Sequence, residues 1–409
     1  MRNVIYVVPV PGENSLLFAD AFRRLDRVRL LAIVQRRPNG PPPEVLERFE
    51  HIVQVDDCFS IEQLAAVVRG YEERYGKTHR IVSALEELQP TLARVRAMCH
   101  IEGMMPDAVD RFTNKATMKQ ALRDAGIAVA KSTLAPDYAA ARAFVDGLLK
   151  YPVVVKPPVG AGTRNTHLCS NDDELRAAMA SVSPSTDSPA QIEEFVEGEE
   201  FSFDTITIDG KVRFTSVTQY FPNPLEVVRN PWIQYSIVMP RDTEAAEFAD
   251  IRAMGTKAVE SLGMGSGFTH MEWFRRKDGS VVISEVAARP PGVQIVPMLS
   301  YAHDVDFRRV WTRAVVDNAY DGPWDRKYAC GVVFLRGVGS GWVSRVDGLD
   351  EISMRLGKYV VDARFPQVGV PKSSHYEGEG YVVLRAQNTE TIRDSLRFIL
   401  DTLRVSYTN

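Results

Sequence analysis

Three short stretches of the chain carry residue types that could do chemistry together. In the first, Lys156 ends an apolar run and is followed by a loop of small residues that includes Gly160, Gly162 and Thr163. Such a loop can bring backbone N–H groups and a cation against phosphate oxygens. A lone lysine at a strand end would more simply be solvated, and small-residue turns are common. Their adjacency, however, predicts a polyphosphate site.

The second stretch, Glu193–Glu200, is acidic. Runs of charge usually form solvated surfaces. Here Phe195 and Val196 interrupt the run in the manner of a strand, whose backbone edge could bind an adenine base. A carboxylate further along, such as Glu200, could accept hydrogen bonds from ribose hydroxyls.

The third stretch offers two carboxylates and an arginine. Glu272 and Glu285 lie on two predicted strands joined by the turn Asp278–Gly279, so a hairpin would bring them side by side. Paired carboxylates repel one another unless a cation joins them, and Mg²⁺ prefers such oxygen ligands. Arg289 follows, and Pro290–Pro291 would hold its guanidinium at a fixed angle for phosphate or carboxylate. Together the three stretches indicate an enzyme that consumes a nucleoside triphosphate.

The elements that must position these residues begin, in the first hundred residues, with a region in which predicted strands and helices alternate. Alternation of strands and helices predicts a parallel sheet with helices on its faces. The βα turn Pro9–Glu13 lacks the glycine pattern of dinucleotide-binding folds, which argues against that function. The predicted elements of this region are strands Val4–Val10, Val28–Gln35 and Arg80–Ser83 and helices Ser15–Leu25 and Ile61–Tyr75.

The rest of the chain is predicted to contain antiparallel strands as well as helices. Thr113 is the predicted N-cap of a helix over Asn114–Ala125, which Gly126 ends. The turn Asp209–Gly210 predicts a hairpin. The predicted strands are Ala128–Leu134, Val153–Lys156, His167–Ser170, Gln191–Val196, Phe201–Ile208, Val212–Tyr220, Gly267–Arg275 and Val281–Val286. The further predicted helices are Asp172–Ala180, Glu244–Leu262, residues 306–319 and Thr389–Leu403.

Composition is that of an ordinary globular protein. The chain has 409 residues, 45% of them apolar, and a net charge of −4, which gives no case for nucleic acid as a partner. No run approaches the ~20 apolar residues that span a bilayer, and the apolar N-terminus is better explained as a buried strand than as an export signal. Four scattered cysteines without metal-type spacing favour a reducing compartment, so a cytoplasmic protein without a membrane partner is expected.

As an ordered set, these motifs resemble those of the ATP-grasp superfamily. The set is Asn114–Lys115, Lys156 with its loop, Glu193–Glu200, Glu272, and Glu285 four residues before Arg289. The resemblance covers roughly residues 110–300, and the form of the last motif leans toward amino-acid (dipeptide) ligases within the biotin-carboxylase-like branch. It implies a mixed α/β (α+β) fold in three parts: an N-terminal α/β domain over 1–112, an ATP-grasp core of two subdomains over 113–309, and a C-terminal α+β domain over 310–409. The resemblance also implies a mobile lid at about 132–192.

The resemblance further implies a role for each matching residue and two cofactors, ATP and Mg²⁺ or Mn²⁺. The residues it assigns to phosphates are Lys115, Lys156, Gly160, Gly162 and Thr163. Those it assigns to adenine and ribose are Glu193, the backbone of Glu194 to Val196, and Glu200. It makes Glu272 and Glu285 the metal ligands, and it makes Arg289, with Lys156, the catalytic group that stabilises an acyl phosphate or its tetrahedral successor.

The activity expected is an ATP-dependent ligation of a carboxylate to an amine, with small molecules, amino acids above all, as partners. Two alternatives stay open: a carboxylase that activates bicarbonate, and an inactive nucleotide-binding regulator. Ala287, where the family often has a metal-binding Asn, counts against the carboxylase and leaves the number of metal ions open. Dimers are frequent in such families, so a homodimer is a further open expectation.

Two more hypotheses concern the substrates. His270 lies two residues before Glu272 and could accept a proton from the amine, although a structural histidine is the simpler interpretation. The wall that faces the substrates is expected from the segments Arg289–Ile295 and Gln219–Trp232, and Trp232 is its test residue.

Overall fold

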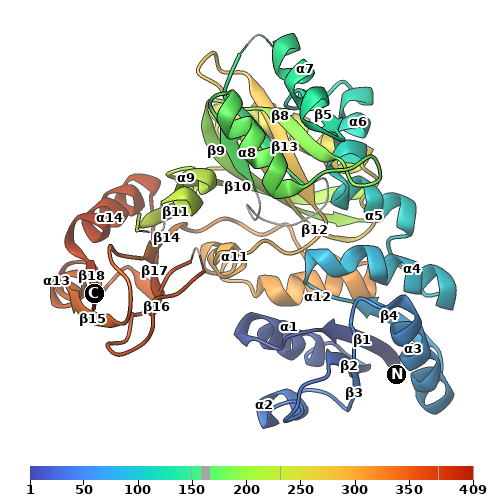
Figure 1. Ribbon diagram of the computed structural model, residues 1–409. Helices are drawn as coiled ribbons and strands as arrows, with labels where there is room; N and C mark the ends of the chain where they lie inside the picture. Colours follow the sequence, from blue (N-terminus) through green and yellow to red (C-terminus); the bar gives the residue numbers. More distant parts are fainter. Residues whose placement is uncertain (149, 158–165, 231, 376, 409) are drawn as a thin grey trace.

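The computed structural model describes residues 1–148, 150–157, 166–230, 232–375 and 377–408 (Figure 1). The predicted phosphate-loop residues Gly160, Gly162 and Thr163 lie outside the described residues. The described residues fold as a mixed α/β protein with a parallel N-terminal sheet and three antiparallel sheets, which confirms the expected fold class.

The N-terminal sheet has the strand order β3-β2-β1-β4, and all of its pairs are parallel. Side chains alternate along β1: Val4, Tyr6 and Val8 pack on the side of α1, while Ile5 and Val7 pack on the side of α3 and α4. Both faces are therefore buried, as in other parallel sheets. The elements are β1 (Arg2–Val8), α1 (Glu13–Arg23), β2 (Val28–Gln35), α2 (Pro43–Leu46), β3 (His51–Val55), α3 (Ile61–Tyr75), β4 (Thr78–Val82), η1 (Glu86–Leu88) and α4 (Gln89–Cys99).

Two helices lead from this sheet into the rest of the molecule, α5 (Pro106–Thr113) and α6 (Lys115–Asp124). The predicted N-cap Thr113 is wrong by one residue. The side chain of Asn114 accepts hydrogen bonds from the backbone N–H groups of Ala116 and Thr117, whereas Thr113 ends α5 and donates its hydroxyl to Val109. Asn114 thus fixes the start of α6 and with it the position of Lys115.

A four-stranded antiparallel sheet of order β5-β8-β6-β7 lies near the top of Figure 1, with α7 and α8 packed on one face. Val153, Val155 and Ile192 point into that core, so their neighbours in sequence, Lys156 and Glu193 among them, face the other way. The elements are β5 (Ser132–Ala135), α7 (Tyr138–Leu148), β6 (Val153–Lys156), β7 (His167–Cys169), α8 (Asp172–Val182) and β8 (Ala190–Glu194).

The largest sheet is antiparallel and has eight strands in the order β13-β12-β9-β10-β11-β14-β17-β16. The predicted Asp209 turn joins β9 to β10, and the predicted hairpin at 278–279 joins β12 to β13. The strands are β9 (Glu199–Ile208), β10 (Lys211–Phe221), β11 (Tyr235–Met239), β12 (Gly267–Arg275), β13 (Val281–Ala287), β14 (Ala329–Leu335), β16 (Val360–Arg364) and β17 (Gly380–Ala386).

Helices cover both faces of this sheet, and α12 lies between it and the N-terminal sheet (Figure 1). A two-stranded sheet of β15 and β18 lies near the C-terminus. The remaining elements are α9 (Pro224–Arg229), η2 (Ala246–Phe248), α10 (Ala249–Ser261), α11 (Ile295–His303), α12 (Phe307–Asp317), β15 (Val343–Asp347), α13 (Leu349–Leu356), α14 (Thr389–Thr402) and β18 (Arg404–Tyr407).

Several predicted boundaries differ from the structure for local reasons. The first strand ends at Val8, because Pro9 cannot continue the hydrogen-bonding ladder. The predicted helix from Glu244 begins as a short 3₁₀ turn, and its α-helical part starts only at Ala249. Across the described ranges, no helix is both long and apolar enough to cross a membrane.

The cap of α6 can be tested by comparing two neighbouring alanine substitutions. Asn114→Ala should lower the free energy of unfolding by about 1 kcal/mol, because two N–H groups lose their acceptor. Thr113→Ala, the matched control, should change it by less than about 0.5 kcal/mol. Urea unfolding of both variants measures the difference, and a larger loss for Thr113→Ala would contradict the assignment.

Candidate functional site

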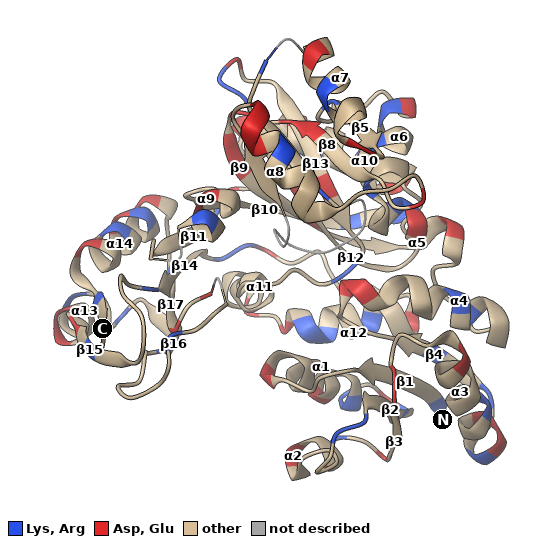
Figure 2. Ribbon diagram, in the orientation of Figure 1, with Lys and Arg blue, Asp and Glu red and all other residues tan. Residues whose placement is uncertain are grey.

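A cavity of about 470 Å³ lies between the β5–β8 sheet and the eight-stranded sheet, and it gathers most of the predicted site residues. Acidic residues on β8 and β9 colour parts of these strands red in Figure 2. Lys115 is not among the lining residues but contacts one of them. The predicted residues that line the cavity are Lys156, Glu193, Glu194, Val196, Glu200, Glu272, Glu285 and Arg289.

The two predicted metal ligands lie opposite one another in the sheet. Glu272 on β12 is the direct register partner of Glu285 on β13, with a bulge immediately after Glu272. Lys115, from the first turn of α6, places its Nζ 2.5 Å from Glu285 Oε1. Burial alone would raise the pKa of Glu285, but Lys115 and then Lys156 outweigh it and hold that pKa below the ordinary value. Glu285 is therefore ionised at neutral pH.

A third carboxylate, Glu200, is buried beside this pair. Burial first, and the neighbouring charge of Glu272 second, raise the pKa of Glu200 well above the ordinary value. Glu272 itself has neither a hydrogen bond nor an ion pair to any residue in the described part of the chain. The charge of Glu272 therefore acts directly on the buried Glu200.

This donor set fits a divalent cation that a ligand helps to hold. Mg²⁺ is usually bound in proteins through one or two carboxylates plus phosphate oxygens, not by an all-protein cage. The structure agrees, because no group of three or more metal-binding side chains comes together among the described residues. Glu272 and Glu285 are the pair that could contribute, and the position two residues beyond, Ala287, offers no side-chain oxygen.

Lys156 belongs to a buried ion-pair triplet with Glu193 and Lys119. Its Nζ lies 2.9 Å from Glu193 Oε2, and Lys119 Nζ lies 2.7 Å from the other oxygen of the same carboxylate. Burial would raise the pKa of Glu193, but the two lysines lower it to about 2. The side chain expected at adenine is therefore engaged by two lysines, and Lys119, which the sequence did not single out, is fully buried on α6.

Arg289 enters the cavity from the loop after β13, and its partner comes from the N-terminal region. Its Nε donates to Glu86 Oε2 at 2.8 Å, and its Nη1 donates to the carbonyl of Pro290 at 3.1 Å. Burial raises the pKa of Glu86 although Arg289 opposes the shift. The loop is strained as well, since Val293 and Gln294 have φ values of 45° and 65°, which are unusual for residues other than glycine. Proline stiffness and the contact with Glu86 together fix the guanidinium.

His270 lines the cavity and is fixed by a buried carboxylate. Its Nδ1 lies 2.6 Å from Asp204 Oδ1, and the other oxygen of Asp204 accepts from Ser202 Oγ at 2.9 Å. Asp204 is the cross-strand partner of His270, so the pair follows from the β9–β12 register. This contact gives His270 a structural partner, which agrees with the simpler of the two interpretations and leaves its chemical role untested.

The cavity has two further walls of different character. Near β6 and β8 it is lined by apolar side chains that suit a flat ring: Ala130, Val154, Leu168, Phe195, Val196 and Phe274. Near α9 it is lined by a second set: Tyr220, Leu225, Val227, Arg229, Tyr235, Ile237 and Val293. Both segments expected to face the substrates contribute to this second wall. Trp232 is half exposed and is not a lining residue.

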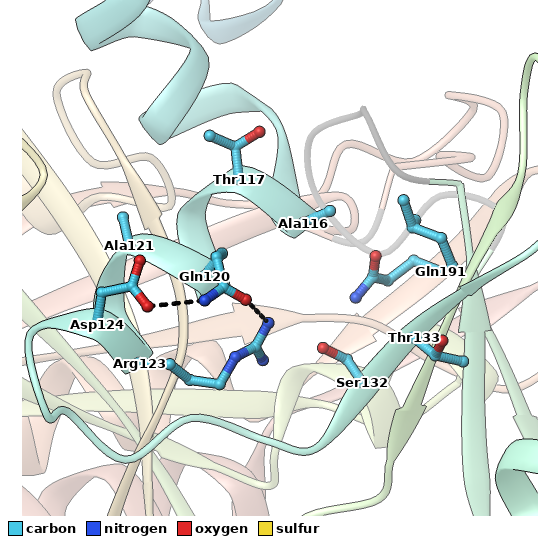
Figure 3. Close-up of a pocket in the computed structure, with 10 residues that line it drawn as sticks. Ala116, Thr117, Gln120, Ala121, Arg123, Asp124, Ser132, Thr133 and Gln191 are labelled. Atoms are coloured by element: carbon cyan, nitrogen blue, oxygen red, sulfur yellow. Dashed lines mark hydrogen bonds between the residues drawn. The ribbon is translucent and has the colours of Figure 1, made fainter.

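A second cavity, of about 550 Å³, lies between α6 and the edge of β5 and β8 (Figure 3). Its polar side chains bond mainly to one another: Gln120 donates to Asp124 at 2.7 Å and accepts from Arg123 at 3.1 Å. No predicted site residue lines it. Of these two cavities, only the first is lined by predicted site residues.

The sequence missed two charged residues of the site, Glu86 and Lys119. Glu86 lies in a short 3₁₀ turn after β4, where the carboxyl ends of parallel strands commonly meet a ligand. Lys119 lies one helical turn after Lys115, so the two share a face of α6. The spacing from Lys115 is the one sequence feature that could have identified Lys119 as a site residue. The sequence around Glu86 contains no feature of comparable strength.

Comparison with known proteins gives one family match. An ATP-grasp domain model matches residues 149–297, the segment that contributes most of the cavity. This segment is therefore similar to an ATP-grasp domain.

Two of the curated relatives are named as an amino acid ligase and a synthase. The chain is 24% identical over 279 residues to the L-arginine-specific L-amino acid ligase of Bacillus subtilis, a match that covers 67% of this chain and 65% of that protein. It is 28% identical over 185 residues to dapdiamide A synthase of Enterobacter agglomerans, which covers 44% of this chain and 42% of that protein. A Sinorhizobium fredii relative is matched over 62% of its length, so the matches with the first relatives span less than two thirds of those proteins.

Solved structures share the fold along the whole chain. The L-amino acid ligase of Bacillus licheniformis superposes with a TM-score of 0.79 at 20% identity, covering 100% of this chain and 99% of that one. The biotin carboxylase domain of Hydrogenobacter thermophilus 2-oxoglutarate carboxylase superposes with a TM-score of 0.72 at 16% identity, covering 99% and 90%. At these identities the likeness establishes the fold.

The crowded carboxylates make a prediction about stability without ligand. Because the folded-state pKa of Glu200 is raised, its ionisation opposes folding once the pH rises above the ordinary glutamate value. Glu200→Gln should therefore stabilise the ligand-free protein by about 1 kcal/mol at pH 8 and by less at pH 5.

Thermal unfolding at both pH values measures this effect, with the exposed Glu197→Gln from the same segment as the matched control. Equal stabilisation by Glu200→Gln at pH 5 and pH 8 would contradict the assignment.

Proposed function

We propose that this protein is an ATP-dependent carboxylate–amine ligase that forms an amide or peptide bond through an acyl phosphate and releases ADP and phosphate. One observation carries the proposal. In a single cavity, Lys156 and Arg289 lie with the facing carboxylates Glu272 and Glu285, next to an apolar slot that suits a base. That combination is what positioning a polyphosphate beside a second substrate requires.

The nucleotide would lie along β6 and β8. Lys156, Lys115 and the loop with Gly160, Gly162 and Thr163 would contact its phosphates, with Glu200 on the ribose. Since the carboxylate of Glu193 is held by Lys119 and Lys156, we assign the adenine contacts to the backbone of Glu194–Val196 and leave Glu193 at the edge of that site.

Glu272 and Glu285 would hold Mg²⁺ or Mn²⁺ against the phosphates. Such an ion neutralises the charge that develops on the transferring phosphoryl group. Lys115 keeps Glu285 ionised and fixes its orientation, which prepares the carboxylate for a cation.

The chemistry needs no nucleophile from the protein. An oxygen of the substrate carboxylate attacks the γ-phosphorus, the bond to the β-phosphate oxygen breaks, and ADP leaves. The amine then attacks the acyl carbon, loses a proton, and displaces phosphate. Arg289, held by Glu86, would stabilise the negative oxygens of both steps, since a fixed guanidinium needs little reorganisation in the transition state.

The substrates are proposed to be amino acids or related small molecules bound at the wall formed by α9 and the loop after Arg289. The naming of amino acid ligases among the relatives supports this class. We also propose a cytoplasmic location, a mobile lid at about 132–192, and domain boundaries near residues 112 and 309; a homodimer is a further proposal.

A second candidate is a carboxylase that activates bicarbonate by the same phosphoryl transfer. The shared fold with a biotin carboxylase domain favours it. Ala287 counts against it, as do the names of two curated relatives, an L-amino acid ligase and dapdiamide A synthase. An inactive nucleotide-binding regulator is the third candidate, and the charged set that lines the cavity counts against it.

Phosphate release from Mg·ATP, measured against amino acids and small carboxylic acids singly and in pairs, tests the proposal. We expect release only with particular pairs, together with a new amide product. Glu285→Ala should lower the rate at least about 100-fold, because a metal-binding carboxylate is lost. The exposed Glu247→Ala is the matched control and should keep the rate.

Other outcomes of this experiment would favour the alternatives. Release with bicarbonate alone would move the protein to the carboxylases. Binding of ATP without release under any condition would favour the regulator and contradict the ligase.

Arg289 should act on turnover more than on nucleotide binding. Arg289→Met is expected to lower kcat by about 100- to 1000-fold, the usual size for a lost oxyanion-stabilising group, with the KM for ATP changed less than about threefold. Steady-state kinetics measures both constants, and Arg241→Met, an exposed arginine bonded to Gln387, is the control. A large rise in the KM for ATP with kcat unchanged would refute the assigned role.

A further inference from the structure

A buried cation lies directly behind the lysine that faces the cavity. Lys119 is fully buried on α6 and is not a lining residue of the cavity. Its Nζ lies 2.7 Å from Glu193 Oε1, and Lys156 Nζ lies 2.9 Å from Glu193 Oε2. A single carboxylate is thus shared by two ammonium groups, one at the cavity and one behind it.

The charges of this triplet decide what a ligand at the cavity would meet. Two lysines and one glutamate carry a net charge of +1. Without Lys119, Glu193 and Lys156 would form a neutral pair, and the carboxylate would compete with any anionic ligand for Lys156. Because the pair lies in a poorly solvated place, that competition would be strong.

We propose that Lys119 is a positioning residue for nucleotide binding: by sharing Glu193 it keeps a net positive charge on Lys156 for the polyphosphate, although it touches no ligand itself. This inference rests on the proposed function, since the ligand is the phosphate chain of ATP.

The charge states of the triplet agree with this role. The two lysines hold the pKa of Glu193 at about 2 against the effect of burial, so the carboxylate is ionised at neutral pH. Burial lowers the pKa of Lys119 to about 8, with Glu193 opposing the fall, so Lys119 is mostly protonated at pH 7. The net charge of +1 is therefore the state at neutral pH.

The position of α6 explains why one helix can serve both halves of the site. Lys115 reaches Glu285 on β13 of the eight-stranded sheet, and Lys119, one turn later, reaches Glu193 on β8 of the smaller sheet. The helix therefore supplies a cation to a carboxylate on each side of the cavity.

A charge-balanced pair of variants separates this role from a purely structural ion pair. Lys119→Met should weaken Mg·ATP binding by about tenfold or more, because Glu193 then neutralises Lys156. The double variant Lys119→Met/Glu193→Gln restores the net charge of +1 and removes the competing carboxylate. Its Kd should return to within about threefold of the wild type, whereas two unrelated structural losses would add.

Isothermal titration of the full chain with Mg·ATP measures the Kd, and thermal unfolding of each variant reports stability separately. Arg123→Met is the matched control, since it removes a positive charge one turn further along the same helix, at the second cavity, and should leave the Kd unchanged.

The outcomes are distinct. The inference would be overturned by a wild-type Kd for Lys119→Met, or by a double variant that binds Mg·ATP as weakly as Lys119→Met does. In either case, binding of Mg·ATP by the wild type would leave the proposed function intact. If Lys119→Met does not fold, the double variant decides alone, and a Kd more than about tenfold above wild type overturns the inference. Failure of the wild type to bind Mg·ATP would overturn both.

Discussion

The arrangement of charge around the cavity depends on one constraint: buried carboxylates need cations within contact distance, since an unpaired buried charge is costly. Glu285 obtains its cation from α6, and Glu193 obtains two, from α6 and from β6. None of these partners is close in sequence to its carboxylate. The fold therefore has to bring α6 against both the β5–β8 sheet and the eight-stranded sheet. The position of α6 thus determines which cations reach Glu193 and Glu285.

Not every carboxylate is balanced in this way. Glu200 and Glu272 lie beside one another, and burial first, with the charge of Glu272 second, raises the pKa of Glu200. A buried carboxylate beside a second one costs stability, and proteins retain such costs where function needs them. A cation bound with a polyphosphate would offset that cost, which links the raised pKa of Glu200 to the proposed chemistry.

The second constraint is the packing that places the side chain of Arg289 at the cavity. Arg289 follows directly from β13, yet its carboxylate partner Glu86 belongs to the turn after β4 of the parallel sheet. Helix α12 packs between that parallel sheet and the eight-stranded sheet, so the distance between Glu86 and Arg289 is set by layers far from either residue. The strained backbone at Val293 and Gln294 lies in the same loop. The site is thus assembled at the meeting of three sheets.

Much of this protein could be predicted from its sequence. The strands and helices with clear periodicity, such as α3 and β12, occur with the predicted bounds, because their burial pattern follows one face of the element. The facing of Glu272 and Glu285 was predictable from the hairpin turn between their strands, since a short turn fixes the register. By contrast, α11 was not identified, because it is buried on most of its surface and lacks a polar face to reveal its period.

The sequence by itself determined the local chemistry: which side chains could bind phosphate or a cation, and which of them neighbour one another along a strand or across a hairpin. Only the tertiary structure decided how those charges are balanced. It gave Glu193 to two lysines, Glu285 to Lys115 and Arg289 to Glu86. The reason is physical: strand register and helix period act over a few residues, whereas the pairing of buried charges depends on how whole sheets and helices pack together.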